Sequence, residues 1–151
     1  MSQIAAIKRW DIIPYAGVGP IRFGMTRAEV RLLLGDGLSV IKKWPYREET
    51  NAYKEIGLHL EYDAKDRLEC IEVWGSCPIY YKGAALLNAS IQEVLERLAN
   101  LGLSPRYDDG YFLDDGGFAL YAPDDVVTAV TVYKKGYYDE APEGVSNNWK
   151  A

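Results

Sequence analysis

Two helix-start signals, each followed by a pair of strand-like segments, constrain the fold of this 151-residue chain more than any other feature. In a capping box, a Ser or Thr and the Glu three residues later each accept a hydrogen bond from the other's backbone amide. Thr26 and Glu29 have this spacing, and so do Ser90 and Glu93. The sequence therefore predicts one helix after each box, with these four residues as structural caps.

Apolar side chains recur at helical spacing after both boxes. The first pattern predicts a short helix over about 27–34, in which Val30, Leu33 and Leu34 form the buried stripe. Either Gly35 or Gly37 can end it in a left-handed conformation. The second pattern predicts a helix that ends at Gly102.

The glycines before the first helix do not make a phosphate-binding loop. A dinucleotide fingerprint requires G-x-G-x-x-G, whereas Gly17 and Gly19 are followed by Pro20, and Gly24 comes two positions late. A P-loop would need Gly-Lys followed by Ser or Thr, which this stretch lacks. The glycines are therefore predicted to serve the backbone.

Two hairpin patterns follow the helices and resemble one another. Residues 58–74 alternate, turn at 63–66 and continue as a strand, and residues 118–133 do the same around a turn at 123–125. At a constant offset of 59, positions 68–74 and 127–133 share the order apolar, polar, small, branched, polar, Val, aromatic.

These matches predict a single α+β domain over 1–151. It consists of two helix-plus-antiparallel-hairpin pseudo-repeats that share one core, with the helices packed on one face of an antiparallel sheet. The first pseudo-repeat spans about 14–75, the second about 80–136, and a polar tail covers 137–151.

The stretch "FGMTRAEVRLLLG" resembles the opening helix of the small outer-membrane lipoproteins of the β-barrel assembly machine. Together with the hairpin "YDAKDRLECIEV", it is also similar to the tandem-repeat β-lactamase inhibitor proteins. The resemblance implies a non-catalytic sheet that grips other proteins. It assigns no binding residue to this chain.

Composition indicates an intracellular protein with no membrane contact. The N-terminal residues lack a long apolar run behind a basic start, which predicts a cytoplasmic location. Cys70 and Cys77 have neither redox nor zinc-knuckle spacing. We expect free thiols, with Cys70 as a small buried hydrophobe.

The net charge of -5 is uneven along the chain. Residues 1–82 carry 12 basic and 11 acidic side chains, or +1, while residues 83–151 carry 5 and 11, or -6. An acidic second half repels phosphate backbones, so nucleic-acid binding is not expected, and it favours a basic partner. Solubility alone would also account for the charge.

Catalytic chemistry has little support in the sequence. His59 is the single histidine, and the paired acids stand beside glycine, proline or tyrosine, where Asp serves as a turn former. We expect no catalytic residue, no metal ion and no cofactor. Two alternatives remain: a small-molecule or hydrolytic site between the repeats that uses Asp, Glu and Tyr side chains, and a structural module that pairs with itself through an edge strand. We expect the chain to be a monomer or a weak homodimer.

Tyrosine is the most informative residue type, because twelve are present and many lie among the acids of the second half. Tyrosine offers a large contact area at a small entropic cost and is enriched at protein interfaces. The sequence predicts an inhibitor or immunity-type protein that binds a basic partner, such as a toxin. The predicted partner-binding residues are Tyr107, Asp108, Asp109, Tyr111, Asp114, Asp115, Tyr121 and Asp124.

Overall fold

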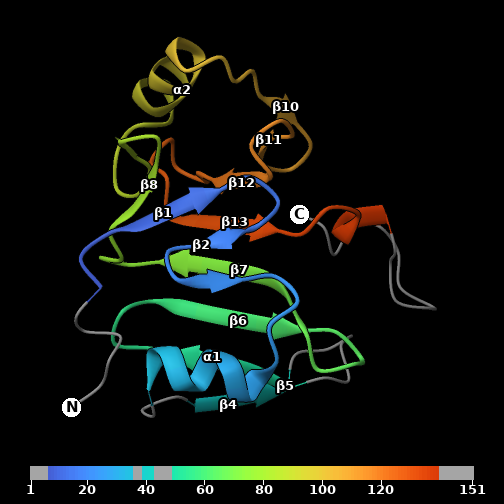
Figure 1. Ribbon diagram of the computed structural model, residues 1–151. Coiled ribbons are helices and arrows are strands. Elements are labelled where there is room, and N and C mark those ends of the chain that lie inside the picture. Colours follow the sequence, from blue (N-terminus) through green and yellow to red (C-terminus); the bar gives the residue numbers. More distant parts are fainter. Residues whose placement is uncertain (1–6, 36–38, 43–48, 140–151) are drawn as a thin grey trace.

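A computed structural model describes residues 7–35, 39–42 and 49–139 and has an α+β fold. Its larger sheet has the strand order β10-β11-β12-β13-β7-β6-β5-β4, and every neighbouring pair is antiparallel (Figure 1). The strands are β4 (Ser39–Lys42), β5 (Glu49–Tyr53), β6 (Leu58–Tyr62), β7 (Leu68–Trp74), β10 (Arg106–Tyr107), β11 (Tyr111–Leu113), β12 (Phe118–Tyr121) and β13 (Ala129–Tyr133).

A second sheet of short strands has the order β3-β2-β1-β8-β9, in which β1 and β8 run parallel. Its strands are β1 (Trp10–Ile13), β2 (Gly17–Val18), β3 (Ile21–Arg22), β8 (Ile79–Tyr81) and β9 (Ala84–Ala85). Figure 1 shows β1 and β2 in front of the middle of the large sheet, between the two helices. The sequence patterns did not predict this sheet.

The first predicted helix is confirmed as α1 (Arg27–Leu34). The Thr26 hydroxyl accepts from the Glu29 amide at 3.2 Å, and the Glu29 carboxylate accepts from the Thr26 amide at 3.0 Å, so the capping box is complete. The hydrogen bonds that the Thr26 amide and hydroxyl donate to the ionised Glu29 carboxylate lower the pKa of Glu29. Gly35, at φ 87°, ends the helix and donates to the Arg31 carbonyl.

The second predicted helix is α2 (Ile91–Asn100), and its capping box is only half formed. Ser90 Oγ accepts from the Glu93 amide at 3.1 Å, but the Glu93 carboxylate lies 3.7 Å from Arg97 one turn further on. Gly102, at φ 88°, ends the helix as predicted. The Gly102 amide donates to the Ala99 carbonyl and the Leu103 amide donates to the Leu98 carbonyl, which is the Schellman arrangement.

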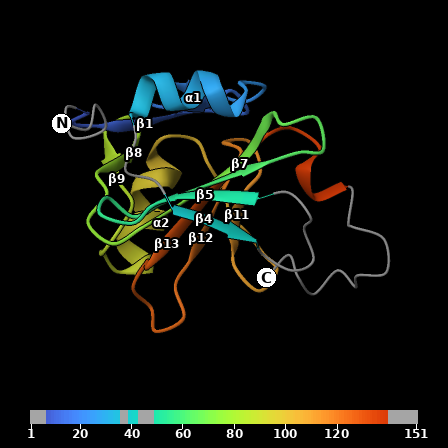
Figure 2. The same cartoon turned by 90° about the horizontal axis from the view of Figure 1, so that it is seen from below.

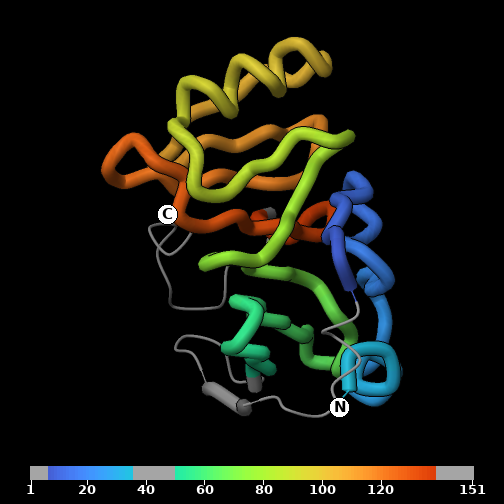
Figure 3. The backbone as a smooth tube through the Cα atoms, turned by 90° about the vertical axis from the view of Figure 1, so that its left-hand side faces the viewer, coloured from blue at the N-terminus to red at the C-terminus, as the bar shows by residue number. Residues whose placement is uncertain are grey.

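Both helices bury their apolar sides in one core with the large sheet. Figure 2 shows α1 and β1 on one side of β4, β5 and β7, and Figure 3 shows the same layers from the side. Leu33 is 38% exposed, so the predicted stripe of α1 narrows to Val30 and Leu34. Side chains of the core include Val30, Leu34, Leu60, Ile71, Val94, Leu98, Phe118 and Val132.

The pairing of β13 with β7 joins the two halves of the chain into one sheet. Glu72 lies opposite Thr131, with Ile71 opposite Val132 beside it. In the order of the strands, β12, β11 and β10 follow β13 on one side, while β6, β5 and β4 follow β7 on the other.

The segments that enter the two helices bond the start of a strand in the same way. Gly24 donates to the Leu68 carbonyl at 2.9 Å, and Asn88 donates to the Val127 carbonyl at 2.8 Å. In return, the Leu68 amide donates to the Met25 carbonyl, and the Val127 amide donates to the Ala89 carbonyl. Strand β13 begins at Ala129 rather than at the predicted position 127, because its pairing with both β12 and β7 starts at Ala129.

Two of the glycines before α1, Gly17 and Gly19, lie where a larger residue would clash or strain the backbone. A Cβ on Gly17 would stand 2.1 Å from the Ile21 carbonyl oxygen in the neighbouring strand. Gly19 has φ 55° and packs against the Trp10 indole, which is fully buried.

Candidate functional site

The predicted partner-binding residues lie at both ends of the outer three strands. The β10–β11 turn and the β12–β13 turn are at one end, because β11 runs antiparallel to both β10 and β12. Asp114 and Asp115 fall in the β11–β12 turn at the opposite end. The predicted set is therefore not one continuous surface.

A hollow of about 200 Å³ lies between the two turns that share an end, and mostly polar atoms line it. It contains four of the eight predicted residues: Tyr107, Asp109, Tyr111 and Tyr121. The others that line it are Gly110, Ala122, Pro123 and Asp125. We call the hollow that these eight residues line the tyrosine–aspartate hollow.

Two tyrosines of the hollow are unusually exposed. Tyr107 is 68% exposed and Tyr121 is 51% exposed, whereas Tyr133 and Tyr137 in the same half of the chain are buried. The Tyr107 ring meets the Tyr111 ring edge-on, with centroids 5.1 Å apart. Tyrosine side chains of this kind offer contact area with little conformational entropy to lose on binding.

The two aspartates of the hollow also have a backbone role. Asp109 has φ 54° and Asp125 has φ 64°, a conformation that Asp tolerates better than most residues. The Asp108 amide donates to the Gly110 carbonyl at 2.9 Å and closes the first turn. Turn formation therefore explains the residue type, while the carboxylates themselves remain at the surface.

Asp125 lines the hollow, whereas the sequence patterns selected its neighbour Asp124. Both are exposed, but only Asp125 lines the hollow. The paired acids after Pro123 gave a turn signal. Which of the two faces the hollow depends on the left-handed backbone at Asp125, and no local pattern specified that.

Ion pairing removes Asp114 from the candidate surface. Arg106 donates from Nε and Nη2 to its two carboxylate oxygens at 2.7 and 3.0 Å, and Asp108 lies 3.8 Å from the same guanidinium. The bond from Arg106 lowers the pKa of Asp114, and the same bond raises the pKa of Arg106.

Many other carboxylates of the described chain also have a cation beside them. Asp11 pairs with Arg9, Asp66 with Arg27, and Lys134 lies near both Asp63 and Glu69. Within residues 7–35, 39–42 and 49–139, no such pair involves Asp109, Asp124 or Asp125. The negative charge at this end of the sheet is therefore uncompensated by the described residues.

The residues with chemical reactivity are held in packing roles. His59 Nδ1 lies 3.2 Å from Glu72 Oε1, and its ring packs edge-on against Trp74. Burial raises the pKa of Cys70, and that of Cys77 to about 12, so both thiols stay protonated. Among the residues described, no group of three His, Cys, Asp or Glu side chains could hold a metal ion.

Comparisons of the chain with protein-family models, with curated proteins and with solved structures find no match. Within the described ranges, neither helix has the length and apolar character needed to cross a membrane.

Proposed function

We propose that this chain is a non-catalytic cytoplasmic module of the inhibitor or immunity type, which binds a basic protein through the tyrosine–aspartate hollow. One observation carries the proposal. The exposed rings of Tyr107 and Tyr121 stand beside Asp109 and Asp125, whose charge the described residues leave uncompensated. A nuclease-like toxin is one class of partner with the required positive charge.

The size of the hollow favours a protein over a metabolite. Sites for small molecules usually enclose about 300–1,000 Å³, which is more than this hollow offers. Exposed tyrosine is instead enriched at surfaces that another protein covers, and the surrounding acids match a partner of positive charge. Opposite charges would also steer the partner and make association sensitive to salt.

We further propose that the chain consists of two pseudo-repeats that share the large sheet. The matching bonds of Gly24 to Leu68 and of Asn88 to Val127 support this, because the donors differ by 64 positions and the acceptors by 59. At the centre of the sheet, Glu72 and Thr131 also differ by 59. The tandem-repeat inhibitors, which the sequence resembles, are organised in the same way.

The test is capture of the partner from the native lysate at low salt, with the tagged chain as bait, salt elution and identification by mass. The double variant Asp109→Asn/Asp125→Asn serves as the probe, because Asn keeps the left-handed turns. Glu55→Gln/Glu96→Gln is the matched control, with the same change in charge at exposed positions outside the hollow and outside the predicted binding residues.

We expect one basic protein in the eluate, and an association rate at low salt that falls at least tenfold in the probe variant but little in the control. Equal rates in the two variants would remove the hollow from the interface. An empty eluate from a lysate that contains basic proteins would contradict the function itself.

A further inference from the structure

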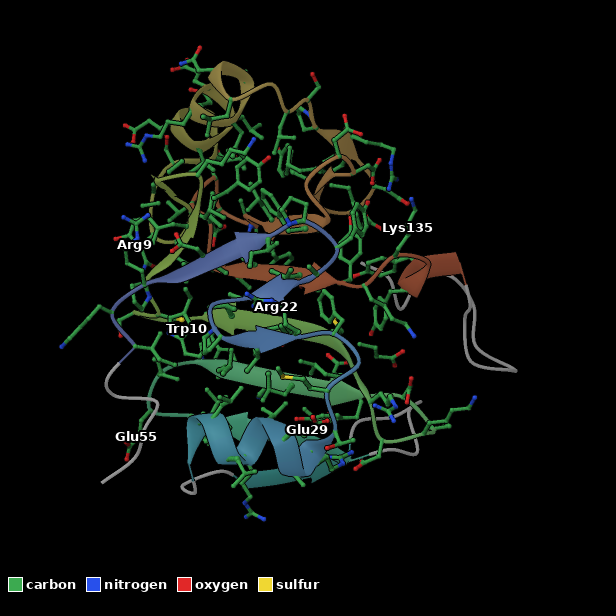
Figure 4. All side chains as sticks on the ribbon, viewed as in Figure 1. Arg9, Trp10, Arg22, Glu29, Glu55 and Lys135 are labelled. Carbon is green, nitrogen blue, oxygen red and sulfur yellow. The ribbon has the colours of Figure 1, made fainter. Side chains whose placement is uncertain are left out.

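Among the described residues, five aromatic rings each have a cation of the same chain above them. Arg9 lies 4.4 Å from the Tyr80 ring centroid, and Figure 4 shows Arg9 and Lys135 on opposite sides of the molecule. The same arrangement occurs across both sheets. The pairs are Arg9 with Tyr80, Arg27 with Tyr62, Lys82 with Tyr81, Arg106 with Phe112, and Lys135 with Tyr15.

The tyrosines of the hollow do not follow this arrangement. Within the described part of the chain, no cation lies over Tyr107, Tyr111 or Tyr121. Two of these rings are nevertheless more than half exposed, which leaves room for a cation from outside. Uncovered rings and uncompensated carboxylates therefore coincide at one place in the fold.

We propose that the tyrosine–aspartate hollow receives the guanidinium group of an arginine side chain, which a partner protein supplies. This inference rests on the proposed function and names the chemistry that the hollow recognises. Carboxylates at Asp109 and Asp125 accept hydrogen bonds from the group, and the exposed tyrosine rings stack beside it.

Arginine fits this lining better than the other cations do. Its guanidinium has five N–H donors and no acceptor, and its flat faces stack on aromatic rings, so it uses both features of the hollow. A lysine ammonium is a compact, strongly hydrated charge that cannot form the planar pair of hydrogen bonds that a guanidinium makes to a carboxylate. A calcium ion needs six to eight oxygen ligands, and among the described residues no group of three His, Cys, Asp or Glu side chains could hold a metal ion.

Arg106 shows how this chain itself holds a guanidinium. It lies over the Phe112 ring at 4.7 Å and donates twice to Asp114. One aromatic ring and one bidentate carboxylate therefore hold an arginine on these same strands. The hollow contains the same two chemical groups without the arginine.

The test uses the folded chain and the peptide Gly-Arg-Gly, with Gly-Lys-Gly as control, followed by NMR at the amides of Gly110 and Ala122. We expect saturable shifts with the arginine peptide, at least fivefold tighter than with the lysine peptide. The variant Asp109→Asn/Asp125→Asn should weaken binding at least tenfold, and Glu55→Gln/Glu96→Gln should not.

The rings are tested by the variants Tyr107→Ser and Tyr107→Phe. If Tyr107→Ser loses affinity for the arginine peptide and Tyr107→Phe retains it, stacking on the ring is supported. Equal affinity of the two variants overturns the role of the ring. Shifts that never saturate, or that are the same for both peptides, overturn the arginine assignment. Tighter binding of free arginine than of the peptide would overturn the assignment to a protein side chain and indicate a small guanidinium ligand.

Failure of this inference is distinguishable from failure of the proposed function. If lysate capture depends on Asp109 and Asp125 but the arginine peptide does not bind, the function holds and arginine is the wrong ligand. If the arginine peptide binds but no basic protein is captured, the hollow recognises guanidinium and the proposed class of partner is wrong.

Discussion

Arg106 and Asp114 form a bidentate ion pair that fastens the outer edge of the large sheet, with bonds of 2.7 and 3.0 Å. The pair links β10, a strand of two residues, to the turn after β11. Because neighbouring residues of a strand point to opposite faces, fixing Arg106 on one face directs Tyr107 to the other. The ion pair thereby helps to place a tyrosine of the hollow.

Asp114→Asn should lower the free energy of unfolding at pH 7 by about 0.5 kcal/mol, because both partners are half exposed. The folded pKa of Asp114 lies below its ordinary value of 3.8, so the pair stabilises the fold above that pH. The stability is lost as the pH falls through the lowered pKa. Urea unfolding of the variant and the parent chain between pH 7 and pH 2.5 should therefore converge at the acid end. A constant difference would contradict the ion-pair account.

The two helix caps should respond differently to double substitution. Thr26→Ala and Ser90→Ala should each cost about 1 kcal/mol, since each loses a bond to an N-terminal amide. In a double-mutant cycle, Thr26 with Glu29 should show a coupling energy, because both halves of that box are formed. Ser90 with Glu93 should be nearly additive. Coupling of equal size in both cycles would mean that the second box closes in solution.

The helices and the long hairpins were predictable because their signals are local. A cap and an apolar stripe lie within a dozen residues, and β6 and β7 are joined by a short turn. The half-formed second box was not predictable, because Glu93 has Arg97 one turn away and the sequence does not rank the two contacts. The exposure of Leu33 likewise depends on how α1 sits on the sheet.

The small sheet could not be predicted, because its pairings are non-local. Strand β1 pairs with β8, which lies more than sixty residues later, and β2 and β3 have two residues each. Strands so short show no alternation from which to infer a face. Only the glycine at position 17 gave a hint, since a close backbone approach requires it.

The candidate site was half predictable for a related reason. Tyrosine among acids indicates a binding surface, and this selected four residues of the hollow. The sequence could not show that Asp114 lies at the far end of β11, or that Arg106 neutralises it. Tyr111 and Asp114 are close in sequence, but they lie at opposite ends of the three-residue strand β11.

Both cysteines should resist thiol reagents in the folded chain. Burial raises the pKa of Cys77 to about 12 and that of Cys70 well above its ordinary value of 9.0, so almost no thiolate is present at pH 8. Ellman's reagent should label neither thiol without denaturant and both in urea. Fast labelling of one thiol in the native protein would show that its segment opens locally, and Cys77→Ala would identify which thiol reacts.

Gly17→Ala should destabilise the fold, whereas Gly110→Ala should not. A Cβ on Gly17 would stand 2.1 Å from the Ile21 carbonyl oxygen, and this backbone atom can move only if β2 and β3 separate. Overpacking of this kind costs about 2 kcal/mol. At Gly110 the nearest atom is 3.6 Å away, which is ordinary contact, so a change within about 0.5 kcal/mol is expected. Urea midpoints of the two variants check the contrast, and a loss at Gly110 equal to that at Gly17 would mean that the turn beside the hollow is packed more tightly than this structure has it.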